Sequence, residues 1–269
     1  MSGDDVCHAE ALRPETVLEP LPPMATIPGN CWECNDHRWS LLHWPGLPLD
    51  YPGLIRIPVL ADGSCFFHTL CRSYHAAYLD MTNEDRGRFV RDLRHDLAIH
   101  LGQHRSDDKT WYQSLSRGAL SSFAEVVPEY SLEAMQNELR YGGAVDNVYN
   151  EYVSDILDKD LHLVDALIGD VYVTGDDDDI LYKNRPSIVI LVWPGHYELL
   201  GVHEPTRRAV TLFEPTHPFI ELLHQRRRYR RSHPRPSYGA PPLPDATPTL
   251  LADQLPVQAV GYDLQHILQ

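Results

Sequence analysis

The chain has 269 residues, enough for one large domain or two small ones, and its 43% hydrophobic and 23% charged residues are ordinary for a globular protein. Its 38 acidic and 23 basic residues give a net charge of −15, although six arginines lie together in residues 224–236. So acidic a body disfavours a nucleic-acid partner and favours a basic protein partner, and the absence of any run of 18 apolar residues predicts no membrane-spanning helix.

The cysteines and the first residues bear on location. Five cysteines are few and odd in number, which argues against a disulfide framework and favours a reducing compartment. The stretch MSGDDVCHAE at the start is acidic and lacks the apolar segment of a secretory signal. The sequence therefore predicts a cytoplasmic or nuclear location, or the host cytosol if the source is a virus or pathogen.

Proline marks both ends of the chain. Nine of the 22 prolines lie in residues 14–58, and seven more lie in residues 234–256. Residues 1–50 show no sustained hydrophobic period and predict a proline-rich arm that wraps over the surface. Residues 223–269 predict a tail that is first rich in arginine and then in proline. The expected folded domain is therefore residues 51–222.

The first half of this domain has helical patterns. GLIRIPVL (53–60) predicts a short strand, and CFFHTLCRSYHAAYL, which follows it closely, has the apolar spacing of a helix. A second helix is predicted in MTNEDRGRFVRDLRHDLAIHL, where Thr82 and Asp85 resemble a capping box. Two further helices are expected at 131–140 and 145–157.

The second half has strand patterns. LHLVDAL and DVYVT predict strands, SIVILVW (187–193) predicts a central one, and HYELLGV (196–202) and AVTLFEP (209–215) predict its antiparallel neighbours. Because the helices come first and the strands last, the predicted fold class is α+β, with a central, mostly antiparallel sheet packed against helices.

Cys65 lies where the turn ADGS leads into a helix. Backbone N–H groups and the positive end of the helix dipole favour a thiolate at such a position. The N–H groups of Asp62, Gly63 and Cys65 can converge on one oxyanion, because glycine lets the backbone turn tightly. A buried core thiol is the alternative interpretation, and it is the one we prefer for Cys71.

His196 is the candidate base. It begins a strand just after a turn, so the strand holds its backbone while its ring projects at the edge of the sheet. Glu198 lies two residues further along, on the same face of that strand. A carboxylate there can accept the imidazole N–H and fix its tautomer, which would complete a set of nucleophile, base and orienting group.

These residues resemble a known family. The motif D-G-x-C followed by two aromatic residues, together with a distant strand, a turn and HYEL, resembles the ovarian tumour (OTU) family of cysteine deubiquitinases. YSLEAMQNELRYGG (130–143) resembles the family's stretch of tyrosine, methionine and Trp-Gly-Gly, with Tyr141 in place of the tryptophan. The resemblance covers about residues 54–215 and implies an OTU-type cysteine protease fold. It also implies hydrolysis of (iso)peptide bonds at the C-terminal glycine of ubiquitin through a Cys65 thioester, without a cofactor.

The resemblance implies a role for each matching residue. His196 would take the thiol proton and later serve the hydrolytic step. Glu198 stands where the family usually has aspartate or asparagine, and Asp62 would shape the oxyanion loop. Trp193 and Tyr197 would contact the substrate beside the ubiquitin tail. The implied partners are ubiquitin or polyubiquitin, and ubiquitin-like modifiers are the alternative.

Two other functions remain open. One is a ubiquitin-binding or scaffold protein on an OTU fold that hydrolyses slowly or not at all, and an intact set of Cys65, His196 and Glu198 argues against it. The other is a protein associated with nucleic acid through its arginine run. The remaining chain, with 17 basic and 38 acidic residues, argues against that function.

Two further motifs could bind metal. Cys31, Cys34, His37 and His43 are of the right ligand types for zinc, and C-x-x-C is a common half-site. The second half of the motif is too close and irregular, so an ordinary loop without metal is the preferred interpretation. The acidic run GDDDDI (175–180) lacks the spacing of a calcium loop and predicts a solvated hairpin tip.

Overall fold

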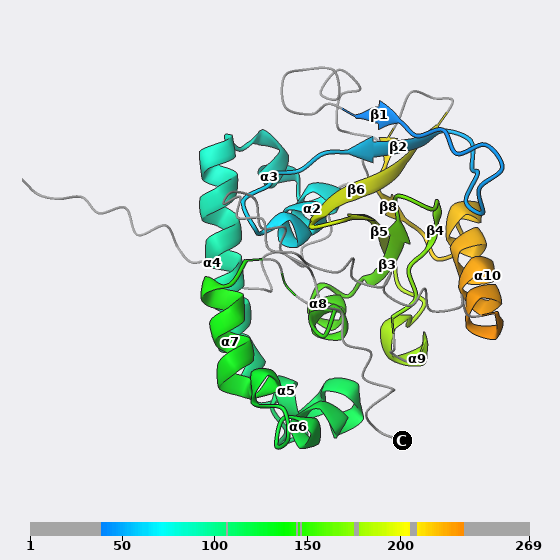
Figure 1. Cartoon of the computed structure of the whole chain (residues 1–269). Helices are drawn as coiled ribbons and strands as arrows, with labels where there is room; N and C mark the ends of the chain where they lie inside the picture. Colours follow the sequence, from blue (N-terminus) through cyan, green and yellow to red (C-terminus); the bar gives the residue numbers. More distant parts are fainter. Residues whose placement is uncertain are drawn as a thin grey trace, which may run out of the picture.

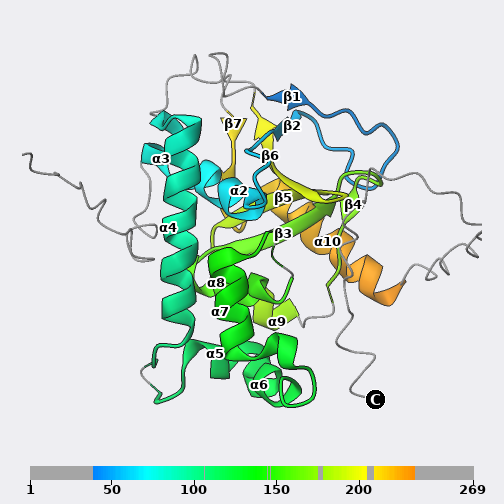
Figure 2. The ribbon, with the colours of Figure 1, turned by 60° about the vertical axis from the view of Figure 1, so that its left-hand side comes forward.

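The structure, a computed structural model, describes residues 39–233 apart from 106, 144, 146, 175–177 and 205–208. Within these residues a central sheet lies between helices (Figure 1), and α4 and α7 stand together at one side of it (Figure 2). No helix in this part of the chain is long and apolar enough to cross a membrane.

The sheet is mostly antiparallel. Its strands follow the order β1-β2-β6-β5-β3-β4, and β7 and β8 pair with β6 and β5. Among the described pairs only β3 and β5 run parallel. The strands are β1 Ser40–Leu41, β2 Leu54–Ile57, β3 Asp160–Asp165, β4 Asp170–Val171, β5 Ser187–Trp193, β6 His196–His203, β7 Ala209–Val210 and β8 Leu212–Phe213. The predicted α+β class is confirmed.

The helices fall mainly before the sheet strands. They are α2 Cys65–Tyr74, α3 Ala76–Asp80, α4 Asn83–Leu101, α5 Trp111–Ser114, α6 Ala119–Phe123, α7 Leu132–Tyr141, α8 Tyr149–Leu157, α9 Asp178–Leu181 and α10 Pro218–Ser232, with 3₁₀ turns η3 Leu115–Gly118 and η4 Pro128–Tyr130. Helix α4 begins as predicted, because the Thr82 side chain accepts a hydrogen bond from the Asp85 N–H at 3.2 Å. The helix predicted after Cys65 is broken at His75, whose backbone is extended.

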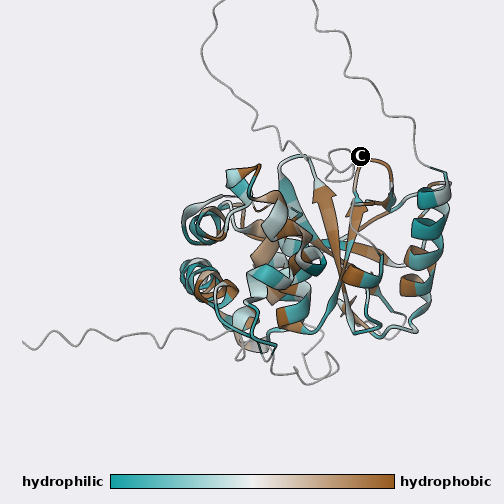
Figure 3. Ribbon diagram, turned by 90° about the horizontal axis from the view of Figure 1, so that it is seen from below, coloured by the Kyte–Doolittle hydropathy of each residue, from teal (hydrophilic) through white to brown (hydrophobic). Residues whose placement is uncertain are grey.

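Two hydrophobic clusters cover the two faces of the sheet. Ile55, Ile57 and Leu199 pack on the side of α2, α4 and α8, whereas Leu54 and Leu200 pack on the side of α10. Figure 3 shows the apolar strands with helices on both sides. This alternation follows from the two-residue period of a strand, and it puts Leu199 and Leu200 of β6 on opposite faces.

The described part of the arginine run lies mostly in helix α10, which ends at Ser232. Arg226 donates two hydrogen bonds to the buried carboxylate of Asp170, and Arg227 and Arg231 pair with Asp178. Asp178 begins the short helix α9, so the hairpin tip predicted for 175–180 is wrong for residues 178–180, and residues 175–177 lie outside the described part of the chain. The arginines therefore hold α10 against the domain through acidic partners.

The expected domain limits stay a prediction. The sheet of the described residues begins at Ser40, before the limit of 51, and Trp44 and Leu49 are buried in the core. Helix α10 runs across the limit of 222 to Ser232.

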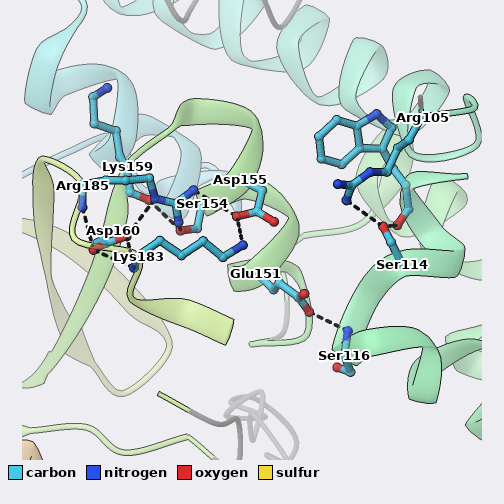
Figure 4. Close-up of polar contacts among 11 residues, drawn as sticks. Arg105, Ser114, Ser116, Glu151, Ser154, Asp155, Lys159, Asp160, Lys183 and Arg185 are labelled. Atoms are coloured by element: carbon cyan, nitrogen blue, oxygen red, sulfur yellow. Dashed lines mark hydrogen bonds and ion pairs between the residues drawn. The ribbon is translucent and has the colours of Figure 1, made fainter. Parts of the chain in front are cut away.

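A polar network ties α8 to the start of β3 (Figure 4). Asp160 is buried, and it accepts hydrogen bonds from Arg185 Nε at 2.8 Å and from the backbone N–H groups of Lys183 and Arg185. Arg185 also donates to Asp155 at 2.9 Å and to the Ser154 hydroxyl at 2.6 Å. The Arg185 guanidinium thus satisfies several buried acceptors at once.

Candidate functional site

Cys65 is the first residue of α2, at the end of a loop that leaves β2. Its side chain is buried, and Gly63 before it has φ +83°, in the left-handed region. A Cβ on Gly63 would lie 3.3 Å from the Gly143 Cα. Glycine at this position therefore lets the loop turn before Cys65 and lie directly against the glycines that follow α7.

The Asp62 side chain holds this loop through hydrogen bonds to Ser64 and His68. Its Oδ1 accepts the Ser64 N–H at 3.0 Å, and the His68 Nε2 lies 3.0 Å from its Oδ2. Burial raises the pKa of Asp62, but the hydrogen bonds from His68 and Ser64 outweigh burial and hold the pKa below its usual range. These contacts agree with the expectation that Asp62 shapes the loop. Its role in binding an oxyanion stays a prediction.

His68 continues the network into the core. Burial lowers its pKa, in spite of the opposing effect of Asp62, so the ring is neutral. A carboxylate only accepts, so the His68 Nε2 carries the proton, and the Nδ1 accepts from the Tyr78 hydroxyl at 2.7 Å. The loop before Cys65 is therefore held by a chain of three side chains that ends in a buried tyrosine.

Arg94 of α4 holds the other side of the loop. Its guanidinium donates to the Ser64 hydroxyl at 2.7 Å and to the Gly143 carbonyl at 3.0 Å. Further bonds of 2.8 to 2.9 Å reach the carbonyls of three residues at the end of α7, namely Glu138, Leu139 and Gly142. One buried cation thus fixes the end of α7 relative to the residue before Cys65.

The start of β6 lies against the Cys65 sulfur. The pairing of β2 with β6 stops at Leu199, and beyond it the Tyr197 backbone N–H points at the Cys65 sulfur. The Tyr197 ring packs edge-on against Phe66 with centroids 5.7 Å apart. The residue that follows His196 therefore touches Cys65 and Phe66, so the two motifs that are far apart in the sequence meet.

The Cys65 thiol is not activated by its surroundings alone. Burial raises its pKa above the ordinary value, although the backbone N–H groups of Tyr197, Phe66 and Cys65 itself act in the opposite direction. The expectation that the helix start favours a thiolate is therefore correct for the local N–H groups, but burial outweighs them. Ionisation of Cys65 needs a proton acceptor.

His196 begins β6 after a tight turn. Its strand partner is Trp193, and between them Gly195 has φ +73°. The imidazole is half-buried. No hydrogen bond joins the His196 ring to Cys65 or to Glu198 in the described part of the chain.

Glu198 has other partners than the imidazole. Its side chain is buried, and its carboxylate accepts hydrogen bonds from Arg56 and from the Trp193 indole. Glu198 lies on the α10 face of the sheet with Leu200, whereas Tyr197 and Cys65 lie on the α2 face. The role of Glu198 as the group that orients His196 stays a prediction that these contacts do not support.

The zinc motif lies mostly outside the described residues. Cys31, Cys34 and His37 are not described, and His43 is. The described residues contain no group of three or more histidine, cysteine or acidic side chains that could hold a metal ion.

Three residues of the site were missed from the sequence. Ser64, His68 and Arg94 bear no motif of their own, and only the structure shows that they contact Asp62 or one another. A usable signal was the helical spacing of Arg94 with the apolar positions of α4, since an arginine on a buried face needs acceptors.

Comparisons with models of known protein families and with curated protein sequences find no match. Eight solved chains are similar to this one, among them an Ovarian Tumor (OTU) domain in complex with ubiquitin. That domain is 17% identical, with 67% of this chain and 88% of that chain covered and a TM-score of 0.42. Identity this low does not assign residue roles, so the proposal below depends on the residues of this chain.

Proposed function

We propose that this protein is a cysteine-type deubiquitinase that hydrolyses (iso)peptide bonds at the C-terminal glycine of ubiquitin. The observation that carries the proposal is the contact between the Tyr197 N–H and the Cys65 sulfur, which brings the backbone of His196 to the nucleophile. The paired motifs around Cys65 and His196, which resemble the OTU family, support the substrate class.

In the proposed reaction His196 accepts the Cys65 thiol proton, and the sulfur attacks the glycine carbonyl. The carbonyl electron pair moves onto oxygen, where N–H groups of Asp62, Gly63 and Cys65 are the proposed donors. The intermediate collapses, the C–N bond breaks, and the leaving amine takes the proton from His196. A water molecule that loses a proton to His196 then hydrolyses the thioester and returns the thiol.

A second candidate is a ubiquitin-binding protein on the same fold that hydrolyses slowly or not at all. Two observations favour it: burial raises the pKa of the Cys65 thiol, and the Glu198 carboxylate is bonded to Arg56 and Trp193. Hydrolysis at the C-terminal glycine of a ubiquitin-like modifier in place of ubiquitin is the remaining variant of the first candidate.

Covalent capture by ubiquitin with a C-terminal electrophile tests the proposal. The intact chain should gain the mass of one ubiquitin, and Cys65→Ala should not, while Cys71→Ser is the matched control and should gain it. Binding of ubiquitin without an adduct would support the second candidate. If ubiquitin neither binds nor forms an adduct, both candidates are contradicted. Probes made from ubiquitin-like modifiers would then test the last variant.

A further inference from the structure

The Glu198 carboxylate is engaged at both oxygens. Arg56 Nη2 donates to Oε1 at 2.7 Å, and Arg56 Nε donates to Oε2 at 2.9 Å, so the guanidinium binds in a two-pronged manner. The Trp193 indole N–H donates to Oε2 at 2.9 Å. The side chain of Glu198 is only 4% exposed, so the carboxylate is shielded from water, whereas the side chain of Arg56 is 38% exposed.

Arg56 and Trp193 also contact each other. The guanidinium carbon of Arg56 lies 4.9 Å from the centroid of the Trp193 ring, within the range of a cation–π contact. Arg56, Trp193 and Glu198, here called the Glu198 cluster, therefore touch pairwise. Because they come from β2, β5 and β6, they tie three adjacent strands together.

The Glu198 cluster lies where the His196 backbone is set. Trp193 is the last residue of β5 and the strand partner of His196, with only the turn of Pro194 and Gly195 between them. Fixing the indole by the Glu198 carboxylate therefore fixes one side of this turn. This turn determines where His196, the first residue of β6, places its imidazole ring.

Moving the Glu198 carboxylate to the His196 imidazole would break the three hydrogen bonds that it accepts from Arg56 and Trp193. The indole N–H of the half-buried Trp193 would lose its acceptor, which is unfavourable, whereas the Arg56 side chain is 38% exposed and its guanidinium would turn to water. A carboxylate with three donors already bound is also a weaker acceptor for a fourth.

We propose that Glu198 is a positioning residue that acts through Trp193 and Arg56 on the turn before His196, and that Cys65 and His196 work as a pair without a carboxylate on the imidazole. This proposal rests on the proposed function, since it assigns roles within the same site. It predicts that the state of the His196 imidazole is independent of Glu198, whereas its position depends on it.

The deciding test does not need ubiquitin. The imidazole signals of His196 are followed by NMR against pH in the full chain and in Glu198→Gln, with the exposed Glu221→Gln as the matched control. The midpoint and the tautomer of His196 should be the same in all three proteins. The proposal would be overturned if the proton affinity of the His196 imidazole fell tenfold or more in Glu198→Gln and stayed unchanged in Glu221→Gln.

Kinetics give a second, independent readout. With a fluorogenic ubiquitin substrate, Trp193→Phe removes the indole N–H but leaves the carboxylate, so it should lower kcat about as much as Glu198→Gln. The double variant should be no slower than the slower single variant, because both changes break one unit. A large loss in Glu198→Gln with normal kcat in Trp193→Phe would contradict the proposal.

The two proposals fail in different ways. If no ubiquitin adduct forms on Cys65, the proposed function is wrong, and the NMR comparison still decides the role of Glu198. If the adduct forms and the His196 midpoint moves in Glu198→Gln, the function stands and the positioning role is wrong. Thermal unfolding of each variant shows which of them are folded. If Glu198→Gln does not fold, the kinetic test still uses Trp193→Phe.

Discussion

The Arg94 guanidinium donates a hydrogen bond to the Ser64 hydroxyl at 2.7 Å, and the same nitrogen donates to the Gly143 carbonyl at 3.0 Å. Ser64 is the residue before Cys65, and Gly143 follows helix α7. Two segments that are about eighty residues apart in sequence are therefore held together by one nitrogen atom of a buried arginine. The position of the loop before Cys65 therefore depends on Arg94 of helix α4.

Arg94→Lys should slow the reaction of Cys65 more than it weakens substrate binding. Lysine keeps the charge but cannot reach all the acceptors of the guanidinium, so the loop before Cys65 loses its support. A displacement of about 1 Å at the nucleophile lowers rates by about 100-fold, and we expect a fall of about 10- to 100-fold in kcat with little change in KM. Arg91→Lys, on the exposed face of α4, is the matched control. Equal kinetics in the two variants would show that Arg94 does not position the loop.

Gly63→Ala should impair both folding and capture. Gly63 has φ +83°, and an added Cβ would lie 3.3 Å from the Gly143 Cα, so alanine there is strained and crowded. The left-handed conformation costs a residue with a Cβ about 1–2 kcal/mol, which urea denaturation can measure. Gly143→Ala is the control, because nothing lies within 4 Å of a Cβ at that position. A neutral Gly63→Ala would mean that the loop has another conformation.

Much of the architecture could be predicted because its signals are local. The alternation of SIVILVW, the capping of α4 by Thr82 and the order of helices before strands all follow from residues close in sequence. Helix α10 could not be recognised in this way, since its arginines look solvated until Asp170 and Asp178 are placed beside them. Part of its stability comes from acidic residues that lie about 50 residues away in the sequence.

The site shows the same limit. The motif around Cys65 and the motif around His196 could be paired from the sequence, and the structure places Tyr197 at the Cys65 sulfur. The partners of Glu198 could not be predicted, because strand periodicity puts His196 and Glu198 on one face but does not say which donors reach the carboxylate first. Arg56 and Trp193 come from neighbouring strands, and only the sheet register brings them there.

Acidification should destabilise the protein through buried histidines. Burial lowers the pKa of His162 well below 6.5, and Arg227 and His224 beside it act in the same direction, while burial also lowers the pKa of His224. The unfolded chain binds protons at these sites below about pH 6.5, and the folded chain does not until the pH is lower. The free energy of unfolding should therefore fall as pH drops below about 6.5.

Urea denaturation at pH 7.5, 6.0 and 5.0 measures this slope. His162→Phe should have a shallower slope than the parent, because the ring against Tyr182 and His224 no longer titrates. His95→Gln, at an exposed position of α4, should leave the slope unchanged. A slope that is the same in all three proteins would contradict the prediction.

Arg185→Met should cost about 3–5 kcal/mol of unfolding free energy. The change leaves the buried carboxylate of Asp160 without its charged partner, which is the most costly way to break a buried ion pair. Lys183→Met is the control, because that ion pair with Asp155 is partly exposed and worth about 0–1 kcal/mol. Guanidinium denaturation with equal slopes for all proteins gives the comparison. Similar losses of unfolding free energy in the two variants would contradict the prediction, because they would show that other groups compensate the Asp160 carboxylate after Arg185 is removed.

Cys65 should react with small alkylating agents more slowly at pH 7 than an exposed thiol, and faster as pH rises. Burial raises the pKa of its thiol, so little thiolate is present without a base. His196→Ala should therefore lower the rate of capture by the ubiquitin electrophile by about 100- to 10,000-fold, the range for loss of a general base. Cys71→Ser is the control, because burial also raises the pKa of Cys71 and its thiol is inert. Rapid alkylation of Cys65 at pH 6 that persists in His196→Ala would show that the thiolate forms without His196.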